Sequence, residues 1–268
     1  MKELQLNQVI RIKGEASPVV ATAIHDGHFL RPEIISNSGL TEEERLREED
    51  PFTAQFISYF PATIVGLRSR FEFDLNRSPE KAIYRIPEDA WGLDVWKTPL
   101  SDQQLAESKV MYDLAFNEMR PFFQACIDEF GSVVVFDCHS YNHRRDGAEG
   151  SIADPQGNPD VNLGTANLNR TIWLPVIEAI TQQFSAHHLD GKPLDVRENI
   201  KFKGGYFSQW LYSEFGDKVC AVAIEFKKIF MDEWTGILHE QHHRELTELL
   251  TGLLPTVEKI REEMNAKH

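Results

Sequence analysis

Cysteine is scarce in this sequence, and long hydrophobic stretches are absent from it. The three cysteines, Cys126, Cys138 and Cys220, are odd in number, far apart and each set in an apolar run. This pattern is typical of buried, reduced thiols and argues against a disulfide framework. Every apolar run is far shorter than the roughly 20 residues that a membrane-spanning helix needs. Residues 1–18 contain no continuous apolar segment, so we expect no signal peptide and a cytoplasmic protein.

Basic residues are also in deficit, because 28 Lys and Arg stand against 42 Asp and Glu, which gives a net charge of -14. A chain this acidic repels phosphate backbones and anionic membrane surfaces, so neither nucleic acid nor a membrane is the expected partner. Repeats and low-complexity tracts are missing, which argues against a solenoid. The sequence does contain 41% hydrophobic residues, enough for a sizeable core, and ten histidines, which are common metal ligands.

The order of apolar patterns along the chain predicts an α/β fold. Continuous apolar runs at 19–24, 132–136 and 219–224 indicate strands that are covered on both faces. The alternating segment 70–75, RFEFDL, indicates a strand nearer the edge of the sheet. We therefore predict a three-layer sandwich in which a mixed, largely parallel sheet lies between helices.

Helical periodicity fills the segments between these runs. A Ser101–Gln104 capping box predicts the start of a long helix that reaches about residue 130, interrupted or kinked at Pro121. Two further helical segments are expected at about 168–188 and 236–264, the second broken near 252–255. No long Pro/Gly/Ser-rich linker divides the chain, so we predict one domain over residues 1–268.

Each of the three buried strands is followed by a residue capable of chemistry, namely His25, His139 and Glu225. Ligands of open α/β sheets bind in the crevice outside the carboxyl ends of the strands. We therefore expect these three side chains to meet at one edge of the sheet.

The histidines predict a metal site. His25 and His28 are three residues apart, and Gly27 between them would allow the tight turn by which both converge on one ion. Asp26 is a candidate to fix a histidine tautomer, and Asp137 could orient His139 or the substrate. The alternatives are two solvated histidines at 25 and 28, and a core histidine at 139 that is satisfied by a backbone carbonyl.

Asp50 is the candidate carboxylate ligand. A Thr41–Glu44 capping box opens a short helix, and Glu48, Glu49 and Asp50 occupy its far end. Acidic groups at a helix C-terminus oppose its dipole unless a cation compensates them. Pro51 fixes Asp50 at the end of the helix, although a solvated acidic face would give the same pattern.

Segment 68–77 and Glu225 suggest how a substrate would be held and attacked. Arg70, Asn76 and Arg77 form a natural anchor for a substrate carboxylate, because guanidinium binds carboxylate through two hydrogen bonds. The alternatives are Arg–Glu pairing on an edge strand and a competing anchor at Asn169-Arg170.

Glu225 follows a buried apolar strand, where exclusion of water should raise the pKa of its carboxyl. Such a group suits general acid–base catalysis, and the alternative is that Glu225 only pairs with Lys227.

At these residues the chain resembles the N-formylglutamate amidohydrolase family. The matching pieces are His25-x-Gly27, Ser69-Arg70-Phe71-x-x-Asp74-Leu75-Asn76-Arg77, Asp137-Cys138-His139-Ser140, Asp160-x-x-Leu163-Gly164-Thr165, Lys203-Gly204-Gly205-Tyr206 and Ile224-Glu225. The resemblance implies a phosphorylase/hydrolase-like fold similar to zinc carboxypeptidases, with Zn²⁺ or another divalent metal. It further implies hydrolysis of N-formyl-L-glutamate to L-glutamate and formate, an amino acid degradation reaction.

In this interpretation Glu225 moves the proton, and Arg70, Asn76 and Arg77 bind an acidic N-acyl amino acid. The related deacylases use a His-x-x-Glu motif, whereas this chain has His28 at the fourth position, so His28, Asp50 or both complete the metal site. A carboxypeptidase-like enzyme or another N-acyl amino acid deacylase is the alternative, and a non-catalytic binding protein on the same scaffold is a third.

Overall fold

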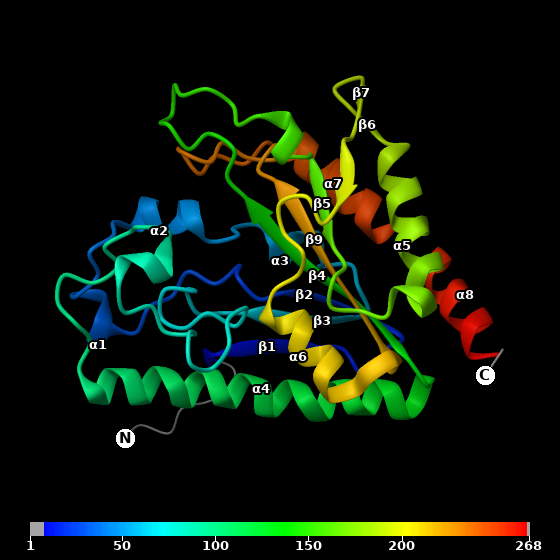
Figure 1. Cartoon of the computed structure of the whole chain (residues 1–268), viewed down its shortest axis with the longest axis horizontal. Helices are drawn as coiled ribbons and strands as arrows, with labels where there is room; N and C mark the ends of the chain where they lie inside the picture. Colours follow the sequence, from blue (N-terminus) through cyan, green and yellow to red (C-terminus); the bar gives the residue numbers. More distant parts are fainter. Residues whose placement is uncertain (1–7, 267–268) are drawn as a thin grey trace.

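A mixed seven-stranded sheet organises the computed structural model, which describes residues 8–266 (Figure 1). The strand order is β1-β3-β2-β4-β9-β5-β8. β2 runs parallel to both β3 and β4, β4 runs parallel to β9, and β5 runs parallel to β8. β1 is antiparallel to β3, and β5 is antiparallel to β9. The strands are β1 (Ile10–Lys13), β2 (Val19–Ala23), β3 (Ala62–Gly66), β4 (Val133–Tyr141), β5 (Val161–Gly164), β8 (Val196–Glu198) and β9 (Val219–Lys227). A separate hairpin joins β6 (His188–Leu189) to β7 (Lys192–Pro193).

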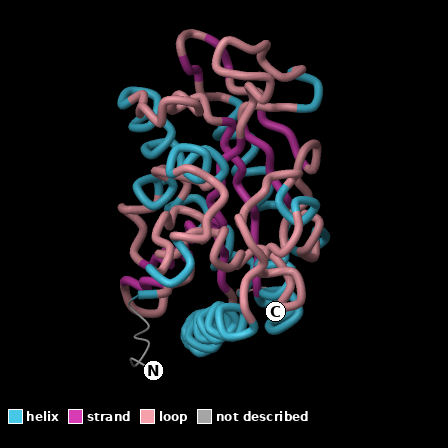
Figure 2. Tube along the Cα trace, turned by 90° about the vertical axis from the view of Figure 1, so that its left-hand side faces the viewer, coloured by secondary structure: helices cyan, strands magenta, loops and turns pink. Residues whose placement is uncertain are grey.

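Helices cover both faces of the sheet. The α-helices are α1 (Pro32–Ile35), α2 (Glu42–Glu48), α3 (Thr53–Phe56), α4 (Asp102–Phe130), α5 (Arg170–Ser185), α6 (Tyr206–Phe215), α7 (Glu240–Thr251) and α8 (Leu254–Asn265). Short 3-10 turns occur at η2 (Pro87–Ala90), η3 (Pro155–Gly157) and η4 (Gly216–Lys218). Apolar residues of α4 and α6 pack on one face, and those of α3, α5, α7 and α8 on the other. Figure 2 shows the strands through the middle of the molecule and the long helix α4 end-on at the bottom.

The central strands are apolar on both faces because helices cover both sides of the sheet. In β4, Val134 and Phe136 belong to one core cluster, whereas Val133 and Val135 belong to the other. Successive side chains of a strand point to opposite faces, so a strand between two helical layers needs apolar residues at every position. The predicted α/β sandwich with a mixed, mostly parallel sheet is thus confirmed.

The helix ends follow local sequence signals. Ser101 and Gln104 form the expected capping box of α4, and Thr41 and Glu44 form that of α2. The helix α4 continues through Pro121 without interruption. A proline inside a helix costs about 3 kcal/mol, and the buried Met119 and Phe123 on either side of it anchor α4 to the core. The break between α7 and α8 falls at residues 252–253, as predicted.

The predicted edge strand at residues 70–75 is wrong. This segment consists of turns and irregular backbone, although Phe71, Phe73 and Leu75 are buried as the alternation suggested. The intervening Glu72 and Asp74 are also fully buried, because arginines pair with them inside the protein. The alternation therefore reflects two kinds of buried side chain, and β1 is the edge strand at this side of the sheet.

Cys126, Cys138 and Cys220 are free and buried, as predicted. Across residues 8–266, no helix is both long enough and apolar enough to cross a membrane.

Candidate active site

Three adjacent strands, β2, β4 and β9, carry the candidate site at their carboxyl ends. His25 lies two residues beyond β2, whereas His139 and Glu225 lie inside β4 and β9, which run further than the apolar pattern indicated. His139 and Glu225 are direct partners in the parallel register of β4 and β9. Asp50 comes from outside the sheet, two residues after the end of α2. The structure therefore brings together side chains that are far apart in the sequence.

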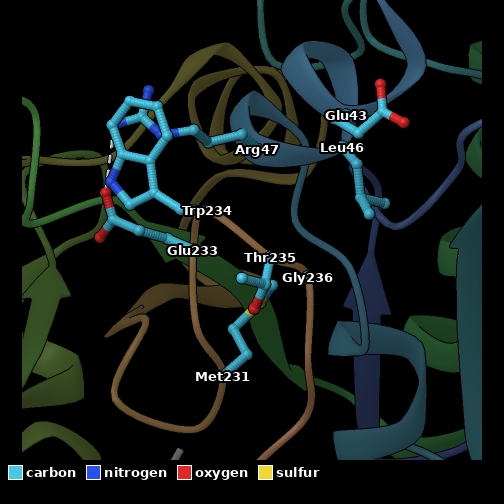
Figure 3. A pocket seen from close by; sticks show the side chains of 8 residues that line it. All are labelled: Glu43, Leu46, Arg47, Met231, Glu233, Trp234, Thr235 and Gly236. Atoms are coloured by element: carbon cyan, nitrogen blue, oxygen red, sulfur yellow. Dashed lines mark hydrogen bonds and ion pairs between the residues drawn. The ribbon is translucent and has the colours of Figure 1, made fainter. Parts of the chain in front are cut away.

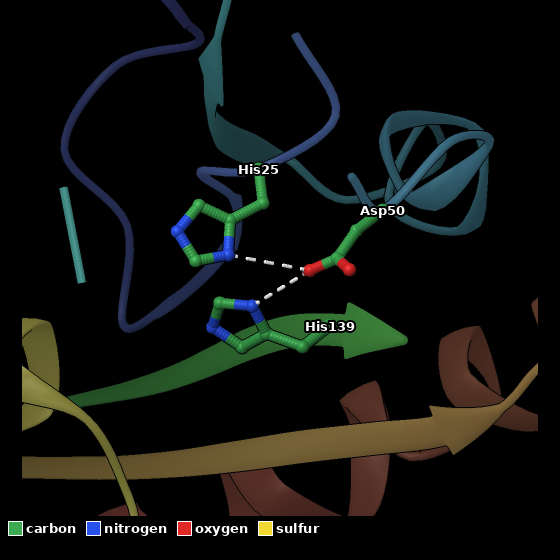
Figure 4. A group of neighbouring side chains, drawn as sticks. All are labelled: His25, Asp50 and His139. Atoms are coloured by element: carbon green, nitrogen blue, oxygen red, sulfur yellow. Dashed lines mark hydrogen bonds and ion pairs between the residues drawn. The ribbon is translucent and has the colours of Figure 1, made fainter. Parts of the chain in front are cut away.

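His25, Asp50 and His139 converge most closely (Figure 4). Each offers a ligand atom within 4.8 Å of the other two, and all three side chains are buried. The Oδ2 atom of Asp50 lies 3.0 Å from Nδ1 of His139 and 3.4 Å from Nδ1 of His25. Two imidazoles and a carboxylate make up a donor set that zinc and similar divalent ions accept.

Carboxylates on the far side of both rings orient this set. Nε2 of His25 lies 2.7 Å from Oδ1 of Asp74, and Nε2 of His139 lies 3.0 Å from Oδ2 of Asp137. Metal-binding histidines usually donate their other ring N–H to such an acceptor, which leaves the facing nitrogen free to bind the metal. In His25 that facing atom, Nδ1, is buried and makes no hydrogen bond within residues 8–266. An unsatisfied buried nitrogen aimed at a carboxylate oxygen fits a site built for a cation.

Asp26 does not perform the tautomer-fixing role predicted for it. Its carboxylate accepts a hydrogen bond from the backbone N–H of Ala54 at 2.9 Å, and burial raises its pKa to about 6. Asp74 contacts the ring of His25 instead, whereas Asp137 contacts His139, the residue it was predicted to orient. Gly27 is needed for close approach rather than for a tight turn, since a Cβ there would lie 2.4 Å from the carbonyl carbon of Leu67.

The carboxylates around His25, Asp50 and His139 shift the pKa values of this group in the direction that negative charge produces. Burial opposes ionisation of Asp50, but the hydrogen-bonded imidazole of His139 and the nearby imidazole of His25 hold the pKa of this carboxyl well below its usual range. Burial likewise opposes the charged form of His139, yet Asp137 and Glu225 raise the pKa of its imidazole well above the ordinary value. Asp137 and Glu225 thus favour positive charge beside Asp50 and His139.

Asp50 is held by both backbone and side chain. Its N–H donates to the carbonyl of His25 at 3.0 Å, and its own carbonyl accepts from Oγ1 of Thr53 at 2.6 Å. Ser140, next to His139, donates from Oγ to Oδ1 of Asp50 at 3.3 Å. These bonds fix the loop after α2 against β4.

The imidazole of His28 points elsewhere. Its Nδ1 hydrogen-bonds to Glu49, which also accepts a hydrogen bond from Ser69, and 30% of the His28 side chain is exposed. The Glu49 hydrogen bond is the main cause that raises the pKa of His28. The structure therefore places His28 beside the site but outside the group of converging ligand atoms.

Asp74 connects His25 to the predicted substrate anchors. Besides His25, its carboxylate accepts hydrogen bonds from Nη2 of Arg70 at 2.8 Å and from the hydroxyl of Tyr84, and Nε of Arg77 lies 3.9 Å away. Arg70 is 13% exposed, whereas Arg77 is 34% exposed and thus more accessible to a ligand. Trp91 stacks beside both guanidinium groups, at 4.9 and 6.0 Å.

Asn76 and the alternative anchor have structural partners. The Oδ1 atom of Asn76 accepts from the N–H of Phe207 at 3.0 Å, in the first turn of α6. A Cβ on Gly205 would lie 2.1 Å from that same Oδ1, so a glycine is required there. Arg170, the competing candidate, forms a bidentate pair with Glu198.

Glu225 has the environment predicted for a proton carrier. Its side chain is 8% exposed, and burial raises its pKa to about 7. The structural alternative, a pair with Lys227, does not occur, because Nζ of Lys227 lies 2.5 Å from Oδ1 of Asp160. Within residues 8–266 no lysine or arginine lies within ion-pair distance of Glu225, so its carboxyl can exchange a proton near neutral pH.

A small pocket lies between α2 and the segment after β9 (Figure 3). The guanidinium of Arg47 stacks at 3.9 Å on Trp234 and pairs with Glu233 at 3.1 Å. Glu233 also accepts from the N–H groups of His143 and Arg144, which ties the loop after β4 to this pocket. None of the predicted site residues lines it; its lining residues are Glu43, Leu46, Arg47, Met231, Glu233, Trp234, Thr235 and Gly236.

Comparisons with known proteins identify solved structures of the same fold. The chain is similar in structure to an N-formylglutamate amidohydrolase from Ralstonia eutropha, with a TM-score of 0.71 and 18% identity over 96% of this chain and 99% of that one. It is also similar to a gene product from Agrobacterium tumefaciens, with a TM-score of 0.66 and 16% identity over 94% of this chain and 97% of that one. At these identities the two likenesses establish the fold alone.

No match was found among curated protein sequences. The family model of N-formylglutamate amidohydrolase, in contrast, matches residues 17–231 and so spans His25, Asp50, His139 and Glu225. The match covers most of the chain, and the protein therefore belongs to the N-formylglutamate amidohydrolase family.

Proposed function

We propose that this protein hydrolyses N-formyl-L-glutamate, or a closely related acidic N-acyl amino acid, with the help of a divalent metal ion, by preference Zn²⁺. The observation that carries the proposal is the buried group of His25, Asp50 and His139, in which Nδ1 of His25 lacks a hydrogen-bond partner in the described chain. That group lies within the segment matched by the amidohydrolase family.

His25, Asp50 and His139 would hold the metal. Their far-side partners, Asp74 and Asp137, keep both imidazoles in the orientation that a ligand needs. When bound, the ion would supply Lewis-acid polarisation of the amide carbonyl and would make a water molecule more acidic. His28 is left outside this set because Glu49 occupies its Nδ1.

Glu225 would carry the proton. As a carboxylate it takes a proton from the attacking water, whose oxygen forms the new bond to the formyl carbon. It then gives that proton to the amine nitrogen as the carbon–nitrogen bond breaks, so formate and free glutamate leave. A carboxyl with a pKa of about 7 suits both steps, because it is readily deprotonated and reprotonated near neutral pH.

Arg77 and Arg70 would provide the positive charge that an acidic substrate requires. Arg77 is exposed enough to form a bidentate contact with a substrate carboxylate, whereas Arg70 already forms an ion pair with Asp74. Both guanidinium groups lie beside Asp74, the carboxylate that also contacts the proposed metal ligand His25. This local charge would let a protein of net charge -14 accept a dianion. A small soluble substrate and reduced cysteines fit the expected cytoplasmic location.

The test combines metal analysis with an assay of product release. The purified protein should contain, or take up, about one divalent ion per chain and release glutamate from N-formylglutamate faster than from N-acetylglutamate. His139→Ala should remove metal and activity together while the chain stays folded. Full metal occupancy in that variant would refute the ligand assignment. Faster release from N-acetyl or peptide substrates would point to another deacylase, and turnover of none of them to a binding protein.

A further inference from the structure

Lys228 is a buried cation to which neither the fold nor the proposed reaction assigns a role. It follows β9 directly, three residues after Glu225, and its side chain is 1% exposed. Burying an ammonium group is costly unless its hydrogen bonds are satisfied. Within residues 8–266 no carboxylate lies within ion-pair distance of Nζ. Nζ instead donates to the carbonyl oxygens of Arg47 and Glu49, at 2.6 and 2.9 Å.

These two carbonyls lie at the C-terminal end of α2, immediately before Asp50. The last carbonyls of a helix lack partners inside the helix, and the negative end of its dipole favours a cation there. Glu48, Glu49 and Asp50 add three acidic side chains at the same place, all buried. Burial lowers the pKa of Lys228 to about 8, so the group remains mostly protonated at pH 7. Arg47 and Arg45 already pair with the side chains of Glu48 and Glu49, at 2.9 and 3.7 Å. Lys228 is therefore the cation that satisfies the last carbonyls of α2.

The backbone of Lys228 connects it to the other side of the site. Its N–H donates to the carbonyl of Tyr141 at 3.0 Å, and Tyr141 is the last residue of β4, two positions after His139. One residue therefore joins the strand of His139, the strand of Glu225 and the turn that presents Asp50.

We propose that Lys228 is a positioning residue that sets metal affinity by fixing the carboxylate of Asp50 opposite His25 and His139. This inference rests on the proposed metal site. Without the ammonium group, the carbonyls of Arg47 and Glu49 lose their donor. The turn would then move, and the carboxylate of Asp50 with it.

The test measures Zn²⁺ affinity by competition with a chelator for wild type, Lys228→Met and Lys227→Met. Lys228→Met keeps most of the apolar stem but removes the donor, and it should bind Zn²⁺ more weakly by about 10- to 100-fold, the usual effect of losing a residue that orients a metal ligand. Lys227→Met is the matched control, because Lys227 pairs with Asp160 away from the metal group, and should keep wild-type affinity. The absorption spectrum with Co²⁺ should change in Lys228→Met only.

A Lys228→Met protein with wild-type Zn²⁺ affinity and an unchanged Co²⁺ spectrum would overturn the inference, even if its melting temperature fell. Should this variant fail to fold, Lys228→Gln, which keeps a neutral donor, replaces it and should also bind Zn²⁺ more weakly than wild type. Wild-type affinity in Lys228→Gln would equally reject the inference. Failure of the wild type itself to bind Zn²⁺ or Co²⁺ would instead refute the proposed metal site and, with it, this role.

Discussion

At the scale of single residues, the most connected carboxylate of the site is Asp74. One fully buried side chain orients His25, accepts hydrogen bonds from Arg70 and Tyr84, and lies near Arg77. Burial alone would raise its pKa, but Arg70 and His25 hold the pKa of Asp74 well below its usual value. An ionised Asp74 therefore couples the proposed metal ligand to the proposed substrate anchor, and the two arginines beside it should differ in function.

Arg77→Met should weaken recognition of a substrate carboxylate with little effect on metal content. Losing hydrogen bonds to a charged group costs about 1.5–3 kcal/mol, so KM for N-formylglutamate should rise roughly tenfold or more. Steady-state kinetics on N-formylglutamate and its side-chain carboxamide, N-formylglutamine, measure the effect. If Arg77→Met discriminates between the two as wild type does, Arg77 does not contact that carboxylate.

Glu225→Gln keeps the shape of the side chain and removes its ability to carry a proton. General acid–base groups contribute about 10²–10⁴-fold to rate, so kcat should fall by that order while metal content stays at the wild-type level. The measurement is kcat together with metal stoichiometry in the same preparation. A kcat within about threefold of wild type, which is under 1 kcal/mol of barrier, would remove Glu225 from the mechanism.

At the scale of elements, α2 and the loops after β4 and β9 behave as one unit. Glu233 joins them, because it pairs with Arg47 of α2 and accepts from the N–H groups of His143 and Arg144. Lys228 makes a second connection between α2 and the end of β9. Figure 1 shows these loops at the same end of the sheet, above the carboxyl ends of β4 and β9.

Glu233→Gln should destabilise the protein in a manner that depends on pH. Burial alone would raise the pKa of Glu233, but hydrogen bonds from His143 and Arg144 lower it from 4.5 to about 2 in the folded chain. A depressed folded pKa gives stability that is present above about pH 4.5 and is lost as pH falls toward 2. The variant should therefore be less stable by roughly 1–3 kcal/mol at pH 6, since hydrogen bonds to a charged group are lost.

Urea unfolding of wild type and Glu233→Gln at pH 6, 4 and 3 measures this difference. The gap between the two proteins should shrink toward pH 3, because Glu233 of the unfolded wild-type chain, with its ordinary pKa of 4.5, takes up a proton in this range whereas the folded chain does not. A gap that stays constant over this range would show that the charge of Glu233 contributes no stability.

At the scale of the whole molecule, the proposed metal would join parts of the chain that folding must first bring together. Asp50 and His139 are 89 residues apart in sequence, and their side chains lie within 3.0 Å of each other. An ion that binds only the folded chain stabilises it by mass action.

Adding Zn²⁺ to metal-free protein should therefore raise the melting temperature. At a free concentration of 100 times Kd the gain is about 2.7 kcal/mol, which corresponds to roughly 5–10 °C for a chain of this size. Differential scanning calorimetry with and without Zn²⁺ measures the shift. His139→Ala serves as the control and should show no such rise; an equal rise in both proteins would place the ion elsewhere.

Local signals in the sequence determined the α/β class, the ends of several helices and the residue types at the carboxyl ends of the strands. Continuous apolar runs such as Val133–Phe136 predict buried strands because both faces must be apolar, and capping boxes predict helix starts because their hydrogen bonds span three residues. The short strands β1, β3, β5 and β8 were not identified, since none of them has more than five residues.

Only the tertiary structure decided which candidate side chains meet. Sequence alone could not choose between His28 and Asp50, because the choice depends on Glu49 binding one imidazole and on the path of the chain after α2. Nor could it reveal Asp74 as the partner of His25, or Lys228 as the cation at the end of α2. The sequence gives the type of each residue, but these contacts depend on β2, β4 and β9 being neighbours in the sheet. That order results from packing between segments that are far apart in the chain.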